Sequence, residues 1–108
     1  MTLYHVTRRE NLDSILRDGL DPSKAKGKRK SVWGVVGTRV AWAIVHVQSK
    51  PWNRGVTLDD LVVIRLTLPR TSVRRYHVGV WHTVEGLGSV PVTPEMVLDP
   101  ADFGKVDH

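Results

Sequence analysis

The chain has 108 residues, enough for one domain, which excludes a multi-domain enzyme. Apolar residues make up 41% of it and charged residues 25%, a composition that supports a folded core and argues against wholesale disorder. A formal charge of +5 favours anionic partners such as nucleic acid, nucleotide phosphates or an acidic protein. The absence of cysteine excludes a disulfide framework, a thiolate nucleophile and cysteine-bound zinc.

The first residues contain no long apolar run of the signal-peptide type, and no segment approaches the roughly 20 apolar residues of a membrane span. We therefore expect a cytoplasmic protein. The histidines do not fall at the spacing of a metal site, and a glycine-rich phosphate loop is absent. The sequence therefore predicts no bound metal.

The first half of the chain predicts a strand followed by a helix. Residues 3–6 form a short apolar strand, and Thr7 precedes Glu10 at the spacing of a capping box. Apolar residues then recur on one helical face until Gly19 provides a C-terminal stop. Residues 21–30 should form a solvated loop, because they contain five basic side chains that could contact an anion or a nucleic acid: Lys24, Lys26, Lys28, Arg29 and Lys30.

A second strand and helix follow, and the rest of the chain favours strands. Residues 31–36 are rich in strand formers, and Gly37-Thr38 predicts the turn and N-cap of a helix that carries Val40 and Ile44. Residues 61–68 give the clearest strand pattern and are apolar enough to be central in a sheet.

Further strands are predicted at 76–84 and 89–92, with a turn at 86–88 between them. Thr93-Pro94-Glu95 predicts a final turn, and residues 99–108 form a loosely ordered tail. The whole chain is thus predicted to be one α+β domain, with helices in its N-terminal half and mostly antiparallel strands after them.

Several of these features occur in an order that resembles the ADP-ribosyltransferase superfamily. Tyr4-His5-Val6-Thr7 is similar to the Tyr-His-x-Thr strand of that superfamily, and residues 11–20 fit its pattern Asn-Leu-x-x-Ile-Leu-x-x-Gly-Leu. Pro94-Glu95 is similar to the Pro-Pro-Glu turn near the end of the domain. The resemblance covers roughly residues 3–98 and implies a split, mostly antiparallel sheet.

The resemblance also implies residue roles in binding and cleaving NAD. His5 would hydrogen-bond the ribose, and the strand at Val6 and Thr7 would hold the carboxamide. Ser31 would also belong to the cofactor-binding residues. Trp33 occupies the place of a Tyr that stacks on the nicotinamide ring. Glu85 lies ten residues before Glu95, the separation found in DNA-modifying toxins, and is the candidate catalytic carboxylate.

The chemistry suits those residue types. Cleavage of the bond between nicotinamide and ribose develops positive charge on the sugar, so a carboxylate at the ribose hydroxyl stabilises an oxocarbenium-like state. Glu85 would supply it, and His5 would help to orient the ribose. The implied activity is NAD-dependent mono-ADP-ribosyl transfer to a protein or nucleic-acid acceptor, with NAD as substrate.

Two alternatives remain open. The RNA 2'-phosphotransferase branch of the same fold also begins with a His-containing strand, and it uses further His and Arg residues to bind a phosphate. His82, Arg39 and Arg65 are available for that role. The other alternative is a catalytically inactive basic module that binds nucleic acid or an acidic protein.

Overall fold

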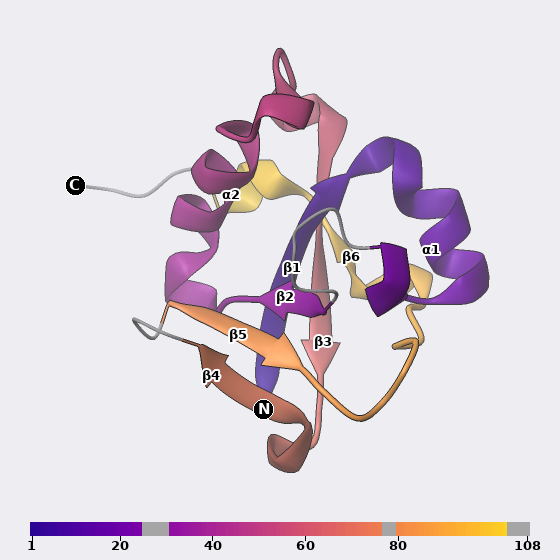
Figure 1. Cartoon of the computed structure of the whole chain (residues 1–108). Helices are drawn as coiled ribbons and strands as arrows, with labels where there is room; N and C mark the ends of the chain where they lie inside the picture. The colour runs from indigo at the N-terminus through magenta and orange to yellow at the C-terminus, as the bar shows by residue number, and fades with distance from the viewer. Residues whose placement is uncertain (25–30, 77–79, 104–108) are drawn as a thin grey trace.

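The computed structural model describes residues 1–24, 31–76 and 80–103. Six strands form two antiparallel three-stranded sheets, and two short α-helices accompany them (Figure 1). This confirms the predicted α+β class and the place of both helices in the N-terminal half. The elements are β1 (Thr2–Arg8), α1 (Leu12–Asp18), β2 (Val32–Gly34), α2 (Val40–Gln48), β3 (Leu61–Thr67), β4 (Val73–Tyr76), β5 (Trp81–Val84) and β6 (Val97–Leu98).

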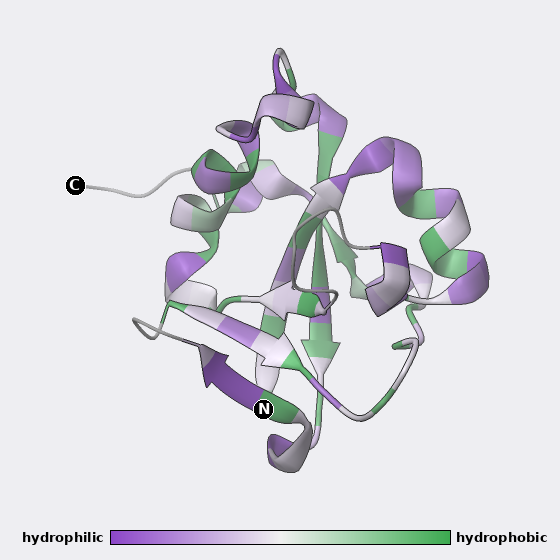
Figure 2. Cartoon of the chain, viewed as in Figure 1, coloured by the Kyte–Doolittle hydropathy of each residue, from purple (hydrophilic) through white to green (hydrophobic). Residues whose placement is uncertain are grey.

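The larger sheet has the order β1-β3-β6, so the apolar strand predicted at 61–68 is central. All seven residues of β1 pair with β3, from Thr2 opposite Thr67 to Arg8 opposite Leu61. Residues 61–64 are buried because both faces of β3 are covered. Figure 2 shows this strand as a mainly hydrophobic ribbon through the middle of the molecule.

The smaller sheet has the order β2-β5-β4, and a single β-bridge between Tyr4 and Val35 joins it to β1. Gly34 lies at this junction, where a Cβ on residue 34 would come within 3.1 Å of the Leu3 Cβ and 3.2 Å of the Tyr4 carbonyl oxygen. The missing side chain therefore allows the two sheets to approach closely.

Two apolar clusters lie on opposite sides of this framework. One joins Leu3 and Val32 to the apolar face of α1, and the other joins Val35 to Val40 and Ile44 from the start and middle of α2. Each helix therefore covers its own cluster, which fixes its position against the sheets. Within the part of the chain described, no helix is long and apolar enough to cross a membrane.

Both predicted helix caps are wrong. Thr7 remains in β1, because β1 stays paired with β3 as far as Arg8, and Glu10 forms an ion pair with Arg8 at 2.9 Å instead of capping. Each helix instead begins with a 3-10 turn, at Arg9–Asn11 and at Gly37–Arg39, and neither turn has a side-chain cap. The stop predicted at Gly19 is confirmed.

The strand predictions in the second half need two corrections. The segment 76–84 is not one strand, since β4 ends at Tyr76 and β5 begins at Trp81, and the two pair with each other. The segment 89–92 contributes one β-bridge, from Val90 to Leu20, instead of a strand. The turn at Thr93-Pro94-Glu95 is confirmed as a 3-10 turn over Pro94–Met96.

The first part of the segment predicted to be loosely ordered is instead packed onto the domain. Asp99 caps a 3-10 turn by accepting a hydrogen bond from the Ala101 amide at 2.9 Å, and Pro100 is buried. The Phe103 ring meets the Tyr4 ring edge-on, with centroids 5.6 Å apart. Residues 104–108 lie outside the described residues.

We predict that Gly19→Ala destabilises the fold. Gly19 has φ +81°, and a Cβ there would lie 2.6 Å from the Val90 carbonyl oxygen, which accepts the Leu20 amide hydrogen bond. The added methyl group must therefore disturb the bridge that holds the end of α1. Urea unfolding should show a loss of about 1 to 3 kcal/mol, whereas Gly55→Ala, also at positive φ but in open space, should cost less.

Candidate functional site

One face of the smaller sheet brings together three residues from β2, β5 and β4. Trp33 is paired with Thr83, and Thr83 is paired with Arg74, so the three side chains share one face. Glu85 follows Thr83 by two positions and therefore lies on the same face. Val32, paired with Val84, faces the core on the other side of the sheet.

Glu85 is held at the end of β5 by contacts from three elements. Its backbone amide donates to the Ser72 carbonyl at 2.8 Å. The Thr83 hydroxyl donates to one carboxylate oxygen at 3.1 Å, and Arg74 Nε lies 3.6 Å from the other. The Glu85 side chain keeps 36% of its surface exposed, so its position is defined while a ligand can still reach it.

His5 links the larger sheet to the smaller one. Its Nδ1–H donates to the Trp33 carbonyl at 2.7 Å, which fixes the tautomer and leaves Nε2 as an acceptor when the ring is neutral. Burial lowers the pKa of His5, and this effect outweighs the hydrogen bond to Trp33, which raises it. The ring is therefore neutral at physiological pH, and its Nε2 can accept a hydrogen bond from a sugar hydroxyl.

His5 and Trp33 do not direct their side chains into one common cleft. His5 contacts the Trp33 backbone, whereas the Trp33 ring meets the rings of Tyr76 and Trp81 edge-on, at centroid distances of 5.1 and 6.2 Å. The cause is strand alternation, since Val32 points into the core and its neighbour must point away. The two residues are nevertheless on adjacent strands, joined by the bridge between residues 4 and 35.

The other residues implied for the cofactor lie around this junction. The Val6 side chain packs on the second apolar cluster, so only its backbone can face a ligand. Thr7 follows His5 by two positions on the same face of β1, and its hydroxyl accepts a 3.5 Å hydrogen bond from Asn11. Ser31 precedes β2 and so lies at the end of the sheet where Glu85 is found.

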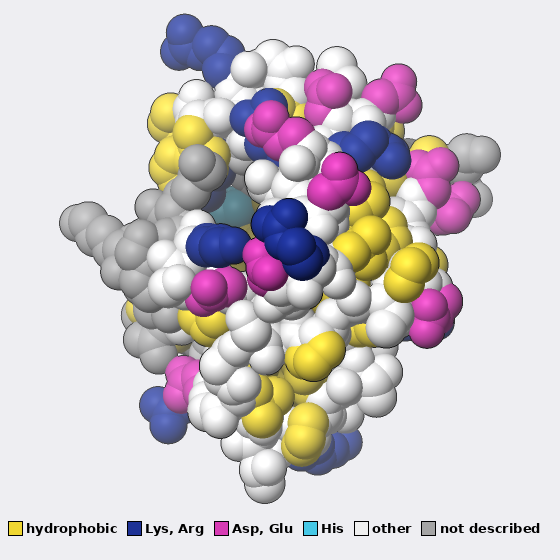
Figure 3. Space-filling model, turned by 90° about the vertical axis from the view of Figure 1, so that its right-hand side faces the viewer, with side chains coloured by type: hydrophobic (Ala, Val, Ile, Leu, Met, Phe, Trp, Pro, Cys, Tyr) yellow, Lys and Arg dark blue, Asp and Glu magenta, His cyan; other side chains and the backbone are white. Residues whose placement is uncertain are grey.

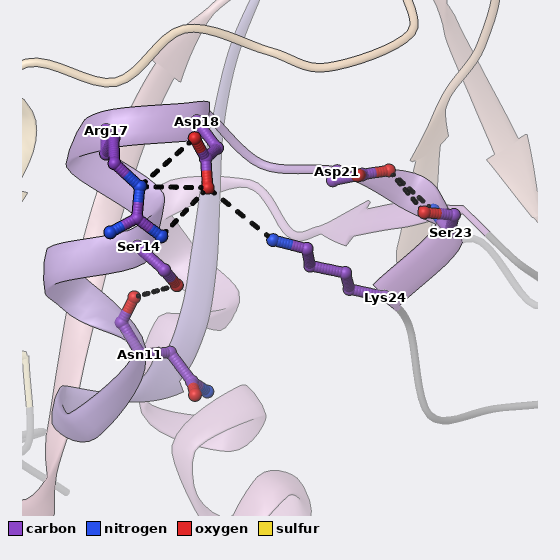
Figure 4. Close-up of polar contacts among 7 residues, drawn as sticks. All are labelled: Asn11, Ser14, Arg17, Asp18, Asp21, Ser23 and Lys24. Atoms are coloured by element: carbon purple, nitrogen blue, oxygen red, sulfur yellow. Dashed lines mark hydrogen bonds and ion pairs between the residues drawn. The ribbon is translucent and has the colours of Figure 1, made fainter.

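The basic segment is described only at its beginning. Lys24 Nζ lies 3.8 Å from Asp18, which also pairs with Arg17 at 3.1 Å (Figure 4). The charge of Lys24 is thus partly matched by an acidic neighbour. The remaining residues proposed for anion contact, Lys26, Lys28, Arg29 and Lys30, lie outside the described residues.

The face of the molecule that carries α1 has mixed charge. Figure 3 shows acidic and basic side chains interspersed there, with apolar groups between them. A pocket of about 230 Å³ lies between the C-terminal end of α1 and residues 89–92, and none of the residues predicted for the site lines it. This face therefore adds no support for an anion site.

Two residues that position Glu85 were missed by the sequence analysis. Thr83 donates to its carboxylate, and Arg74 pairs with it from β4. Alternation around Glu85 could have identified Thr83 as its neighbour on the same face. Arg74 could not be found in this way, because β4 was not predicted.

Comparison with protein-family models, curated proteins and solved structures finds no match to this chain.

The neutral, partly buried His5 makes stability depend on pH. The pKa of His5 in the folded protein lies below the ordinary value of 6.5. Between these two values the unfolded chain therefore binds more protons than the folded protein does. The stabilisation is present above about pH 6.5 and is lost as the pH falls toward the folded pKa. We predict that urea unfolding shows lower stability at about pH 5.5 than at about pH 7.5.

His5→Gln should show a smaller pH dependence, because Gln can donate to the Trp33 carbonyl but does not titrate in this range. Part of the dependence should remain, since burial also lowers the pKa of His46. An equal pH dependence in both proteins would show that His5 is not the group responsible.

Proposed function

We propose that this protein cleaves NAD and transfers ADP-ribose to a protein or nucleic-acid acceptor, with Glu85 as the catalytic carboxylate. One observation carries the proposal: a continuous set of contacts joins His5 to the Trp33 backbone, Trp33 to Thr83 across the strand pair, and Thr83 to Glu85. Three of these residues, His5, Trp33 and Glu85, come from distant parts of the chain and are implied by the resemblance to ADP-ribosyltransferases. Thr83 connects Trp33 to Glu85.

The arrangement supplies the groups that the reaction needs. The Trp33 ring offers an aromatic surface for the nicotinamide, on the sheet face that also carries Glu85. The carboxylate of Glu85 can stabilise positive charge on the ribose as the bond to nicotinamide breaks. His5 acts on this face through its hydrogen bond to the Trp33 carbonyl, and exposed Arg74 can contact a phosphate of NAD.

In the proposed reaction, the bond between the ribose carbon and the nicotinamide nitrogen breaks, and nicotinamide leaves with the bonding electron pair. An acceptor nucleophile then forms a bond to the same carbon and loses its proton. Glu85 stabilises the charge that develops between these events. The proposed reaction would take place in the cytoplasm, where NAD is available.

The experiment that tests the proposal is release of nicotinamide from NAD by the purified protein, alone and with DNA, RNA or cell lysate. Release that rises with one acceptor supports the transferase and identifies the acceptor class. Absence of release in every arm contradicts it and favours the inactive basic module.

The RNA 2'-phosphotransferase alternative has less support from the geometry. His82, one of its candidate phosphate ligands, is only 8% exposed, and its pairing with Gly34 places it on the core-facing side of β5. Removal of a 2'-phosphate from RNA with consumption of NAD, without transfer to another acceptor, would nevertheless establish this alternative.

A further inference from the structure

A row of aromatic side chains runs from the smaller sheet onto the outer face of α2. We call it the aromatic row, and it consists of Trp33, Tyr76, Trp81, Trp42 and His46. The first three residues come from the three strands of one sheet, and the last two lie four positions apart on α2. Figure 1 shows α2 next to β5, where the two parts meet.

Each ring of the row contacts at least one other ring of the row. Trp81 lies 6.2 Å from Trp33 and 5.4 Å from Trp42, measured between ring centroids. His46 is stacked on Trp42 at 5.1 Å with an interplanar angle of 20°, and it also meets Trp81 at 5.1 Å. The row is therefore a continuous surface whose rings support one another.

The outer end of the row is exposed. Trp42 keeps 43% of its surface accessible, and Trp52, beyond the end of α2, keeps 46%. Trp is among the side chains that gain most from burial, and the apolar side of α2 is already filled by Val40 and Ile44. The exposed indoles are therefore not needed to form the core.

Positive charges accompany the row along its length. Arg39 lies in the 3-10 turn that leads into α2, three positions before Trp42, and Lys50 lies two positions after the last residue of α2. The pKa of His46 is lowered mainly by burial of the ring and, to a smaller extent, by the nearby positive charge of Lys50. The Nζ atom of Lys50 also lies 5.9 Å from the centroid of the Trp52 ring. Arg74 belongs to the same sheet face as Trp33.

We infer that the aromatic row binds single-stranded nucleic acid, with bases stacked on the exposed rings and phosphates contacted by Arg39, Lys50 and Arg74. Successive aromatic side chains beside cations are the combination that holds a single strand without sequence preference. The formal charge of +5 acts in the same direction, because it attracts a polyanion from a distance.

The surface discriminates between kinds of polymer. A single strand offers unstacked bases to the rings, whereas the bases of a duplex are already stacked on one another. An acidic peptide could pair with the cations but has no flat ring systems to place on Trp42. The row should therefore prefer single strands to duplexes and to acidic peptides.

The test is fluorescence anisotropy with a dye-labelled thymidine oligonucleotide of about 12 residues, a length within the range that such surfaces bind. A uridine oligomer, a duplex of the same length and a polyglutamate peptide serve as comparisons. Both single strands should bind, and the duplex and the peptide should bind more weakly. NAD is left out, so the result does not depend on the proposed transferase.

Trp42→Ala should weaken binding of the single strand by about fivefold to a hundredfold, the usual effect of losing one stacked base. Trp42→Phe should retain most of the affinity, because a ring remains. Leu87→Ala is the matched control, since Leu87 has the same 43% exposure but lies in the turn after β5. Circular dichroism should show the same fold for all three variants.

Salt dependence separates the cations from the rings. Lys50→Gln should reduce the slope of log affinity against log salt by about 0.7, the value for one phosphate contact on a single strand. Arg17→Gln, an equal loss of charge on α1, should leave the slope nearly unchanged, and so should Trp42→Ala. Unchanged affinity in folded Trp42→Ala, or equally tight binding of duplex or polyglutamate, would overturn the inference.

Discussion

Glu85→Gln is expected to lower nicotinamide release from NAD at least about a hundredfold while leaving the fold intact. The amide keeps the shape of the side chain and can still accept a hydrogen bond from Thr83. It carries no negative charge, so it cannot balance the charge that develops on the ribose. The effect should appear mainly in the rate of the chemical step rather than in NAD affinity.

Glu95→Gln is the matched control for this experiment. Glu95 is exposed in the 3-10 turn Pro94–Met96, and hydrogen bonds from its own backbone and from Thr93 lower its pKa. The same chemical change there should alter nicotinamide release little. Equal activity of Glu85→Gln and the parent protein would remove Glu85 from the site.

The largest expected loss of stability comes from the central strand. Ile64 lies in the middle of β3, is fully buried and has paired neighbours on both sides, His5 in β1 and Val97 in β6. Ile64→Ala should lower the free energy of unfolding by about 2 to 5 kcal/mol, through lost apolar burial and the cavity left behind. The melting temperature should fall by about 8 °C or more.

Arg65→Ala provides the comparison at the next position of the same strand. Arg65 is exposed, although it lies on the same face of β3 as Leu61 and Val63, which are buried in the second apolar cluster. Its replacement should change stability by less than about 0.5 kcal/mol. Similar losses in both variants would mean that the stability of the core does not depend on the burial of Ile64.

The parts of the fold that could be predicted are those with a strong local pattern. The run at 61–68 is apolar apart from Arg65 and Thr67, and this predicted both its strand conformation and its central place. Gly19 could be predicted to end α1, because glycine readily adopts the positive φ that is common just after a helix, and this preference is local. The predicted cap at Thr7 is wrong because β1 stays paired with β3, a distant strand, as far as Arg8. The predicted cap at Thr38 is wrong because residues 37–39 form a 3-10 turn that continues directly into α2.

The candidate site was predictable only in part, for the same reason. The motif around His5 could be found in the sequence, but its bond to the Trp33 carbonyl depends on how two sheets meet. The direction of the Trp33 ring follows from a register with β5 that no local pattern reveals. Arg74 acquires its role only when β4 and β5 pair, whereas the contact between Thr83 and Glu85 is local to β5.

The most direct test of the proposed NAD site is the response of individual Trp indole N–H signals to NAD in a two-dimensional NMR spectrum. Trp33→Phe assigns one signal and Trp52→Phe another. Saturating NAD should shift the Trp33 signal, which lies on the sheet face with Glu85, and should leave the Trp52 signal, at the far end of α2, nearly unchanged. An unshifted Trp33 signal at millimolar NAD, or equal shifts of both signals, would contradict the proposed site.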